Sequence, residues 1–221
     1  MTDTATPEAA KTPDRRARRR LETMTEILDL AEDVMEEEGV AGLSLAEVAR
    51  RLGVQPPSLY KYFPSLTAVY DALFERGQVA NLAAMRAAAE HAAPGIPALT
   101  AVLEAGGRFL LEHPALGQLL FWRPVPSFEA SDTAMAASRE MVELQRGMLR
   151  DAVADGQLGP GADSEEAVML LGSLICGVCT MAMANEPGRP WGEGRFSPLL
   201  PKLLGTLAAL YPPKPARRRR S

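Results

Sequence analysis

The side chains best suited to contact nucleic acid lie close together in residues 44–63, which read SLAEVARRLGVQPPSLYKYF. A glutamine can bond the edge of an adenine, and a proline offers apolar contact to a thymine methyl group. Hydroxyl and ammonium groups suit phosphate oxygens, which fix register without carrying sequence information. We therefore expect groove contacts from Gln55, Pro56, Pro57, Ser58 and Tyr62, and phosphate contacts from Ser44, Tyr60 and Lys61. For Tyr60, packing within the motif is the alternative.

Two short helical patterns, separated by a Gly-Val turn, would present these side chains. Ser44 can cap the first helix, with Glu47 completing a capping box. Gly53 stands where a helix exit often needs a left-handed residue, and Pro56 would lie in the first turn of the second helix. The apolar faces comprise Leu45, Val48, Ala49 and Leu52 in the first helix, and Leu59 and Phe63 in the second. This is the pattern of a helix-turn-helix, whose second helix enters the DNA major groove.

The rest of the chain is also predicted to be helical, because long runs keep helical spacing and lack the alternation of strands. A helix over residues 18–38 precedes the motif, and Ser65 can cap a long helix that reaches about residue 90. Breakers separate predicted helices over residues 99–112, 115–122, 132–155, 164–186 and 198–211. We expect an all-α fold. Its three-helix helix-turn-helix domain covers residues 18–64, and a long linker helix begins a helical ligand-binding and dimerisation domain over residues 65–211.

Charge is distributed unevenly along the chain, whose formal net charge is −4. Eleven of the 24 basic residues lie before Leu21 or after Tyr211, and 13 basic residues face 25 acidic ones between them. An acidic body argues against nonspecific coating of nucleic acid. We expect a disordered basic arm over residues 1–17 and a disordered basic tail over residues 212–221. Arg18 and Arg19 would reach phosphates or a minor groove, and a purely solvated arm is the alternative.

With its flanking helices included, this part of the chain resembles the TetR family of bacterial transcriptional regulators. The resemblance covers residues 24–73, and its most specific part is the run LYKYFPS over residues 59–65, which is similar to the family's recognition-helix signature. Further matching positions are Ala31, Gly39, Leu45, Val48, Ala49, Gly53 and Val54. The C-terminal two thirds are similar in architecture only.

The resemblance implies a homodimer that reads a palindromic operator, with recognition helices about 34–36 Å apart. Repression is the common mode in the family, and release by a small-molecule effector would be the regulatory step. One position departs from the family pattern. The family usually has a phosphate-contacting lysine after the position of Ser65, whereas this chain has Leu66. We expect Lys61 or the arginine arm to substitute for that contact.

The middle helices carry the side chains expected to line an effector pocket, because such pockets are mostly apolar with few polar groups. The expected lining is Arg108, Phe109, His113, Phe121, Trp122, Met141, Met181 and Trp191. Small residues of the helix over residues 164–186 would let another helix approach closely, and the last helix supplies leucines. The expected dimer interface comprises Gly172, Cys176, Thr180, Leu203 and Leu207.

Cys176 and Cys179 could also form a redox or metal pair. The sequence offers no nearby His or further Cys, and no βαβ context, so we favour a structural role and expect no metal and no cofactor. No apolar run approaches a membrane span and no secretory signal is evident, which predicts a cytoplasmic protein. Three alternatives remain open: a ligand-independent regulator, a nonspecific DNA-binding dimer, and a small helical enzyme.

Overall fold

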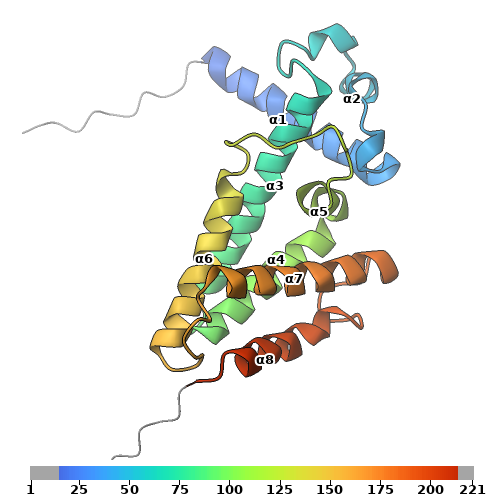
Figure 1. The fold of residues 1–221 in the computed structure, drawn as a ribbon. Coiled ribbons are helices and arrows are strands. Elements are labelled where there is room, and N and C mark those ends of the chain that lie inside the picture. The colour runs from blue at the N-terminus through green and yellow to red at the C-terminus, as the bar shows by residue number, and fades with distance from the viewer. Residues whose placement is uncertain (1–14, 214–221) are drawn as a thin grey trace, which may run out of the picture.

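A computed structural model describes residues 15–213 as helices and their connections, with no strand in that range (Figure 1). The all-α prediction is therefore confirmed. The elements are α1 (Arg15–Glu38), η1 (Val40–Gly42), α2 (Leu45–Leu52), η2 (Pro56–Ser58), α3 (Leu66–Ala89), α4 (Ile96–Glu112), α5 (Pro114–Phe121), α6 (Ala136–Ala154), α7 (Glu165–Asn185), η3 (Ser197–Leu199) and α8 (Leu200–Leu210), where η denotes a 3₁₀ helix.

The N-terminal head, comprising α1, η1, α2 and η2, follows the sequence signals in most places. Gly53 ends α2 in the left-handed conformation (φ 73°, ψ 26°). The Ser65 hydroxyl accepts a hydrogen bond from the Ala68 amide at 3.1 Å and so caps α3. The helix α1 begins at Arg15, so residues 15–17 are helical and do not belong to a disordered arm. The remainder of the expected arm, residues 1–14, and residues 214–221 of the expected tail lie outside the described residues.

Two local predictions in the head are wrong. The expected capping box is absent: Ser44 makes no side-chain cap to α2, and the Glu47 carboxylate accepts hydrogen bonds from Arg50 and Arg51 and does not reach back. The expected second helix of the motif is a single 3₁₀ turn, Pro56–Ser58, followed by a hydrogen-bonded turn. Prolines at both ends of this short segment explain the difference, because Pro57 disfavours helical backbone at residue 56 and Pro64 ends the turn.

The helix α3 joins the head to the C-terminal body, which comprises α4–α8 (Figure 1). Its 24 residues span about 36 Å. Val69, Leu73 and Phe74 belong to a core shared with α1 and α5, and Leu82 and Met85 belong to a second core shared with α4, α6, α7 and α8. Both cores therefore pack against the same helix, α3, which acts as a rod between the head and the body.

The connection between α5 and α6 crosses α3 on the face seen in Figure 1. Phe128 is buried there, with its ring centroid 5.7 Å from that of Tyr70 and 6.1 Å from that of Phe74. Asp71 accepts bonds from the Ser131 amide and hydroxyl at 2.7 and 2.8 Å. Residues 132–135 form turns, so α6 begins at Ala136, later than predicted.

The helix α7 carries more apolar surface than the sequence reading allowed for. It is long and apolar enough to cross a membrane by length and composition alone, although 33% of the relevant window is buried in the body. The expectation that no apolar run approaches a membrane span is therefore wrong for α7. The exposed apolar side chains of α7 are Met169, Leu170 and Met181. Leu199 of η3 and Leu210 of α8 are exposed as well.

Candidate nucleic-acid interface and apolar cavity

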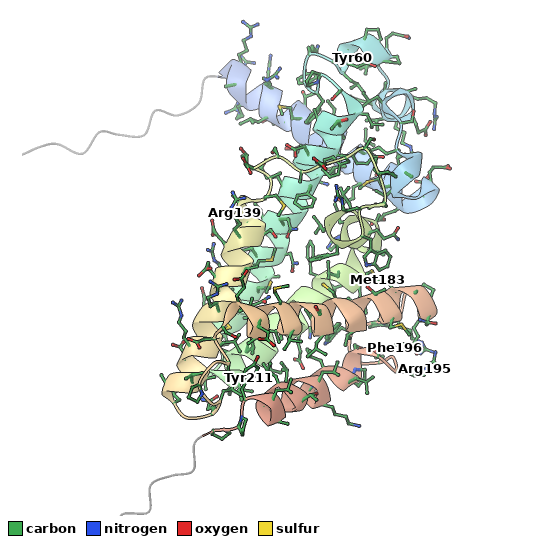
Figure 2. All side chains as sticks on the ribbon, viewed as in Figure 1. Tyr60, Arg139, Met183, Arg195, Phe196 and Tyr211 are labelled. Atoms are coloured by element: carbon green, nitrogen blue, oxygen red, sulfur yellow. The ribbon has the colours of Figure 1, made fainter. Side chains whose placement is uncertain are left out.

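The turn after α2 holds its polar side chains outward over two buried anchors. Leu59 and Phe63 are 1% and 3% exposed, which fixes the turn against the core of the head. Gln55, Pro57 and Lys61 are exposed, and Pro56, Ser58, Tyr62 and Ser44 are half-buried. Tyr60 is 52% exposed at the tip of the head (Figure 2), which does not favour the packing alternative. The expected contact residues thus share one end of the molecule.

A basic head patch forms where the start of α1 meets the residues after η2. It comprises Arg16, Arg19, Arg20 and Lys61, together with Thr23 and Tyr62. Arg20 donates from Nη1 to the Lys61 carbonyl at 2.9 Å. The Arg20 guanidinium and the Lys61 ammonium lie 5.2 and 5.0 Å from the centroid of the Tyr62 ring. Cation–π contact with one ring holds these two like charges beside each other on the surface.

The two arginines expected to contact DNA, Arg18 and Arg19, have different environments. Arg19 lines the patch, whereas Arg18 faces Glu22 one turn along α1 at 3.5 Å. Only Arg18 and Arg19 were named as contact residues, although Arg16 and Arg20 belong to the same basic run of the sequence. Their four-residue spacing places them on one helix face, a signal that becomes readable once α1 is extended to Arg15.

The arginines of α2 are paired with carboxylates, unlike those of the basic head patch. Arg51 bonds Glu37 of α1 at 2.7 Å and Glu47 at 2.8 Å, and Arg50 bonds Glu47 at 2.6 Å. Hydrogen bonds from Arg50 and then Arg51 lower the pKa of Glu47 to about 2, and Arg51 likewise lowers the pKa of Glu37. The positive charge open to a phosphate is therefore concentrated at α1 and Lys61.

A polar joint connects the head to the body. Arg76 of α3 donates to Asp29 and Glu32 of α1, and His113 Nδ1 lies 3.6 Å from Glu32 Oε1. The buried Tyr70 hydroxyl donates to the Val40 carbonyl at 2.6 Å. His113 thus lies at the joint, and it does not line the cavity described next.

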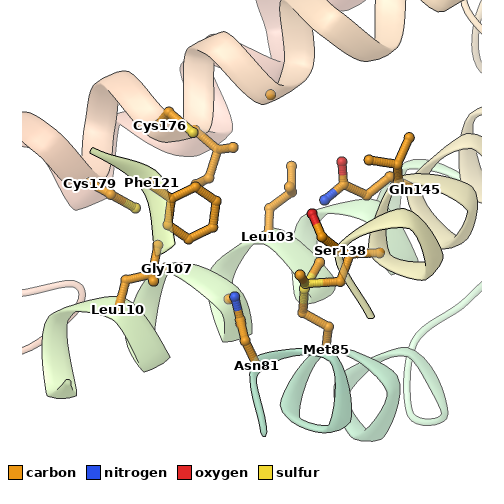
Figure 3. A pocket seen from close by; sticks show the side chains of 15 residues that line it. Asn81, Met85, Leu103, Gly107, Leu110, Phe121, Ser138, Gln145, Cys176 and Cys179 are labelled. Carbon is orange, nitrogen blue, oxygen red and sulfur yellow. The ribbon is translucent and has the colours of Figure 1, made fainter. Parts of the chain in front are cut away.

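The body holds a cavity of about 150 Å³ between α3, α4, α6 and α7, partly open to solvent beside the exposed side chains of Phe121 and Val142 (Figure 3). Its lining is Asn81, Met85, Leu103, Gly106, Gly107, Leu110, Phe121, Ser138, Met141, Val142, Gln145, Gly172, Ile175, Cys176 and Cys179. Of the predicted lining, Phe121 and Met141 are present. The helical phase of α4 explains the absence of Arg108 and Phe109, because Gly106, Gly107 and Leu110 border the cavity and the two side chains between them point away.

The other residues predicted for the pocket lie elsewhere. Arg108 is exposed, and the Phe109 ring packs against the His113 ring at 4.7 Å. Trp122 donates from Nε1 to the Thr180 hydroxyl at 3.0 Å, and Met181 is 45% exposed. Trp191 lies behind the cavity wall, with its ring against the backbone of Gly107.

The residues predicted for a dimer interface have mixed environments. Gly172 and Cys176 line the cavity, and Thr180 bonds Trp122. Leu203 is half-buried, while Leu207 is 2% exposed and belongs to the core of its own chain. The exposed apolar residues of α7 and α8 named above are the ones available to a partner.

Both cysteines are free thiols in a weakly polar setting. Burial raises the pKa of Cys176, and burial together with Cys176 raises the pKa of Cys179 to about 12. A thiol that stays protonated is a poor nucleophile and a poor metal ligand. Within residues 15–213 no group of three or more His, Cys, Asp or Glu side chains could hold a metal ion.

A helix-turn-helix head with a basic surface, joined by one long helix to a helical body, defines a two-domain regulatory protein. Residues 27–73 match the family model of bacterial regulatory proteins of the tetR family, and residues 99–194 match the tetracyclin repressor-like C-terminal domain. The chain belongs to the TetR family of bacterial regulatory proteins, which confirms the resemblance seen in the sequence.

Two curated relatives match the head. The HTH-type transcriptional regulator YobS of Bacillus subtilis is 40% identical over 55 residues, which are 25% of this chain and 29% of that protein. The tetracycline repressor protein class A from transposon 1721 of Escherichia coli is 45% identical over 49 residues, which are 22% of this chain and 23% of the repressor. The chain thus matches less than a third of the length of these relatives.

Solved structures match nearly the whole fold. A protein of unknown function from Rhodococcus sp. RHA1 has a TM-score of 0.71 at 26% identity, covering 85% of this chain and 94% of that one. The transcriptional regulator FadR of Bacillus subtilis, in complex with stearoyl-CoA, has a TM-score of 0.65 at 18% identity, covering 83% and 96%. At that identity the likeness to FadR concerns the fold alone.

Proposed function

We propose that this protein is a sequence-specific DNA-binding repressor that binds a palindromic operator as a homodimer and is released by a small-molecule effector. The observation that carries the proposal is the basic head patch, which adjoins the exposed side chains of residues 55–62 at one end of the molecule. The patch would bind phosphates and fix the register, while Gln55, Pro57 and Ser58 would face base edges. We place this activity in the cytoplasm.

Lys61 is the residue with which to test the DNA contact. Duplexes bound by the purified chain are selected from a random pool, and affinity is then measured by fluorescence anisotropy over a range of salt concentrations. Loss of one phosphate contact in Lys61→Ala would weaken binding to all duplexes and reduce the slope of log K against log salt by about one. Arg150→Ala removes an exposed cation from α6 and serves as the matched control, with an unchanged slope.

Two results would count against this account. Equal affinity for the selected duplex and a scrambled duplex at fixed salt would replace sequence-specific regulation with nonspecific binding. An unchanged salt slope in Lys61→Ala would remove that side chain from the phosphate contacts.

The dimer is supported by the apolar surface of α7 and α8. Met169 and Leu210 are 65% and 63% exposed, which is costly in water and typical of a helix that lies against a partner. Two such helices from each chain would form a four-helix interface. The molar mass in solution by light scattering tests this, since a monomer at micromolar concentration would contradict it.

The effector response is supported by the apolar cavity, which lies against α3, the helix that leads into the head. A ligand can shift the spacing of two heads only by its differential affinity for the two states. The competing hypothesis is a regulator whose body only dimerises. Apolar small molecules that raise the melting temperature and release the selected duplex favour the effector response, whereas release by none of them favours the competing hypothesis.

A further inference from the structure

The size of the cavity restricts what it can hold. Its volume is about 150 Å³. An engineered protein cavity of about 150 Å³ lined by apolar side chains takes up benzene. The space therefore suits a molecule of one ring or a short branched chain. A long-chain acyl-CoA, such as the ligand of the FadR complex, is far too large for it.

The lining restricts the charge of the occupant. Among the residues that surround the cavity none is Lys, Arg, His, Asp or Glu. An ion placed there would give up part of its hydration without gaining a charged partner, which is unfavourable. The occupant is thus expected to be uncharged.

One polar side chain in the wall lacks a partner. Asn81 of α3 is 3% exposed, and its Oδ1 accepts no hydrogen bond from any described residue. Figure 3 shows this carboxamide directed into the space between α3, α4 and α7. Buried polar groups are nearly always hydrogen-bonded, and the exceptions call for an explanation. A bound ligand that donates a hydrogen bond to Asn81 Oδ1 would explain this exception.

The position of Asn81 is set by the helix packed against it. Gly106 of α4 has no side chain, and a Cβ there would stand 3.4 Å from Asn81 Oδ1 and 3.4 Å from Met85 Sδ. These are close van der Waals distances, so α4 packs tightly against the carboxamide. The other neutral polar groups of the lining, Ser138 and Gln145, are half-buried and reach solvent more readily.

We infer that the cavity binds a small uncharged ring compound with a single hydroxyl group, and that Asn81 recognises this hydroxyl. A hydroxyl can donate to Oδ1 and accept from Nδ2, so it satisfies the carboxamide in either orientation of the amide. The apolar ring contacts Leu103, Leu110 and Met141. This inference rests on the proposed effector response and gives its ligand a chemical class.

Calorimetric titration of the full chain with phenol, toluene and benzoate tests the recognition. Phenol and toluene are similar in size, and they differ in the hydroxyl. We expect binding of phenol and toluene and none of benzoate. Asn81→Leu keeps the volume and removes the amide, so the phenol-to-toluene affinity ratio should fall by about 5- to 160-fold, the factor associated with an unsatisfied buried hydrogen-bonding group.

Gln78 offers a matched control on the same helix. It is 1% exposed, its Oε1 is also without a partner, and it does not line the cavity. Gln78→Leu should therefore leave the phenol-to-toluene ratio unchanged. A fall of equal size in Gln78→Leu would overturn the assignment of recognition to Asn81.

The inference fails if phenol does not bind the unmodified protein, if benzoate binds as tightly as phenol, or if Asn81→Leu keeps the wild-type ratio. Failure of the proposed function has a different signature. In that case phenol binds with the expected dependence on Asn81 but does not release the selected duplex. The binding and release measurements therefore separate the two.

Discussion

The contact between Gly107 and Trp191 allows a precise test of how the cavity wall is built. A Cβ added at Gly107 would overlap the outer edge of the indole and stand 2.9 Å from Cε3. The rigid ring would have to move, because the obstacle is a ring and not the end of a flexible chain. Overpacking of this kind destabilises by about 1–3 kcal/mol.

Helix propensity acts in the opposite direction and must be separated from the clash. Replacement of a glycine by alanine inside a helix is favourable by about 1 kcal/mol. Gly147 of α6 provides the reference, because a Cβ there has only Arg150 Nη2 nearby, at 4.0 Å. The propensity gain cancels between the two variants. We therefore expect Gly107→Ala to be less stable than Gly147→Ala by about 1–3 kcal/mol.

Urea denaturation at one protein concentration, followed by circular dichroism, gives the difference in free energy of unfolding. Equal concentrations are essential because dimerisation would stabilise the folded chain by mass action. The tryptophan emission of folded Gly107→Ala should also shift to longer wavelength as Trp191 moves into water. Equal stability of the two variants, with unchanged emission, would refute the account of this wall.

Three further predictions concern the head. Ser65→Ala should lower the free energy of unfolding by about 1 kcal/mol through loss of the α3 cap, whereas Ser44→Ala, which removes no cap, should change it little; equal effects in urea denaturation would contradict this. Tyr70→Phe should destabilise by about 0.5–1.5 kcal/mol, the net contribution of one hydrogen bond, since the Val40 carbonyl keeps only the longer 3.4 Å bond from the Leu43 amide. A neutral result by the same assay would exclude the Tyr70 bond. The pKa of Glu47 is lowered in the folded chain, so this carboxylate contributes stability that is complete above the unfolded pKa of about 4.3 and is lost as pH falls toward about 2. Glu47→Gln should therefore flatten the acid side of the profile of melting temperature against pH. An unchanged profile would argue against the ion pairs.

Much of the head could be predicted from the sequence because the residues that begin and end its helices act locally. Gly53 and Ser65 act through the backbone within a few residues of themselves, and the structure places both as expected. The capping box failed because Glu47 has competing partners. A pattern of four residues does not show that Arg50 and Arg51 satisfy this carboxylate first.

The cavity lining could not be predicted in the same way. Which residues of α4 face inward depends on the rotation of that helix against α3 and α6, a property of the packed structure. Asn81 and Gln78 carry a weak signal in the sequence, since they are amides on the face of residues 66–89 that the apolar residues also occupy. The length and hydrophobicity of α7 can be read from the sequence, but which of its apolar side chains are exposed cannot.

The rod shared by both cores has a geometric consequence for any ligand in the cavity. Asn81 lies 15 residues from the start of α3, which corresponds to about 22 Å along the helix axis. The helix would act as a lever of that length with its fulcrum beside the cavity. A tilt of about 5° would displace the end that holds the head by about 2 Å. Under the proposed function, a tilt of this size would bring a reading head out of register with a groove.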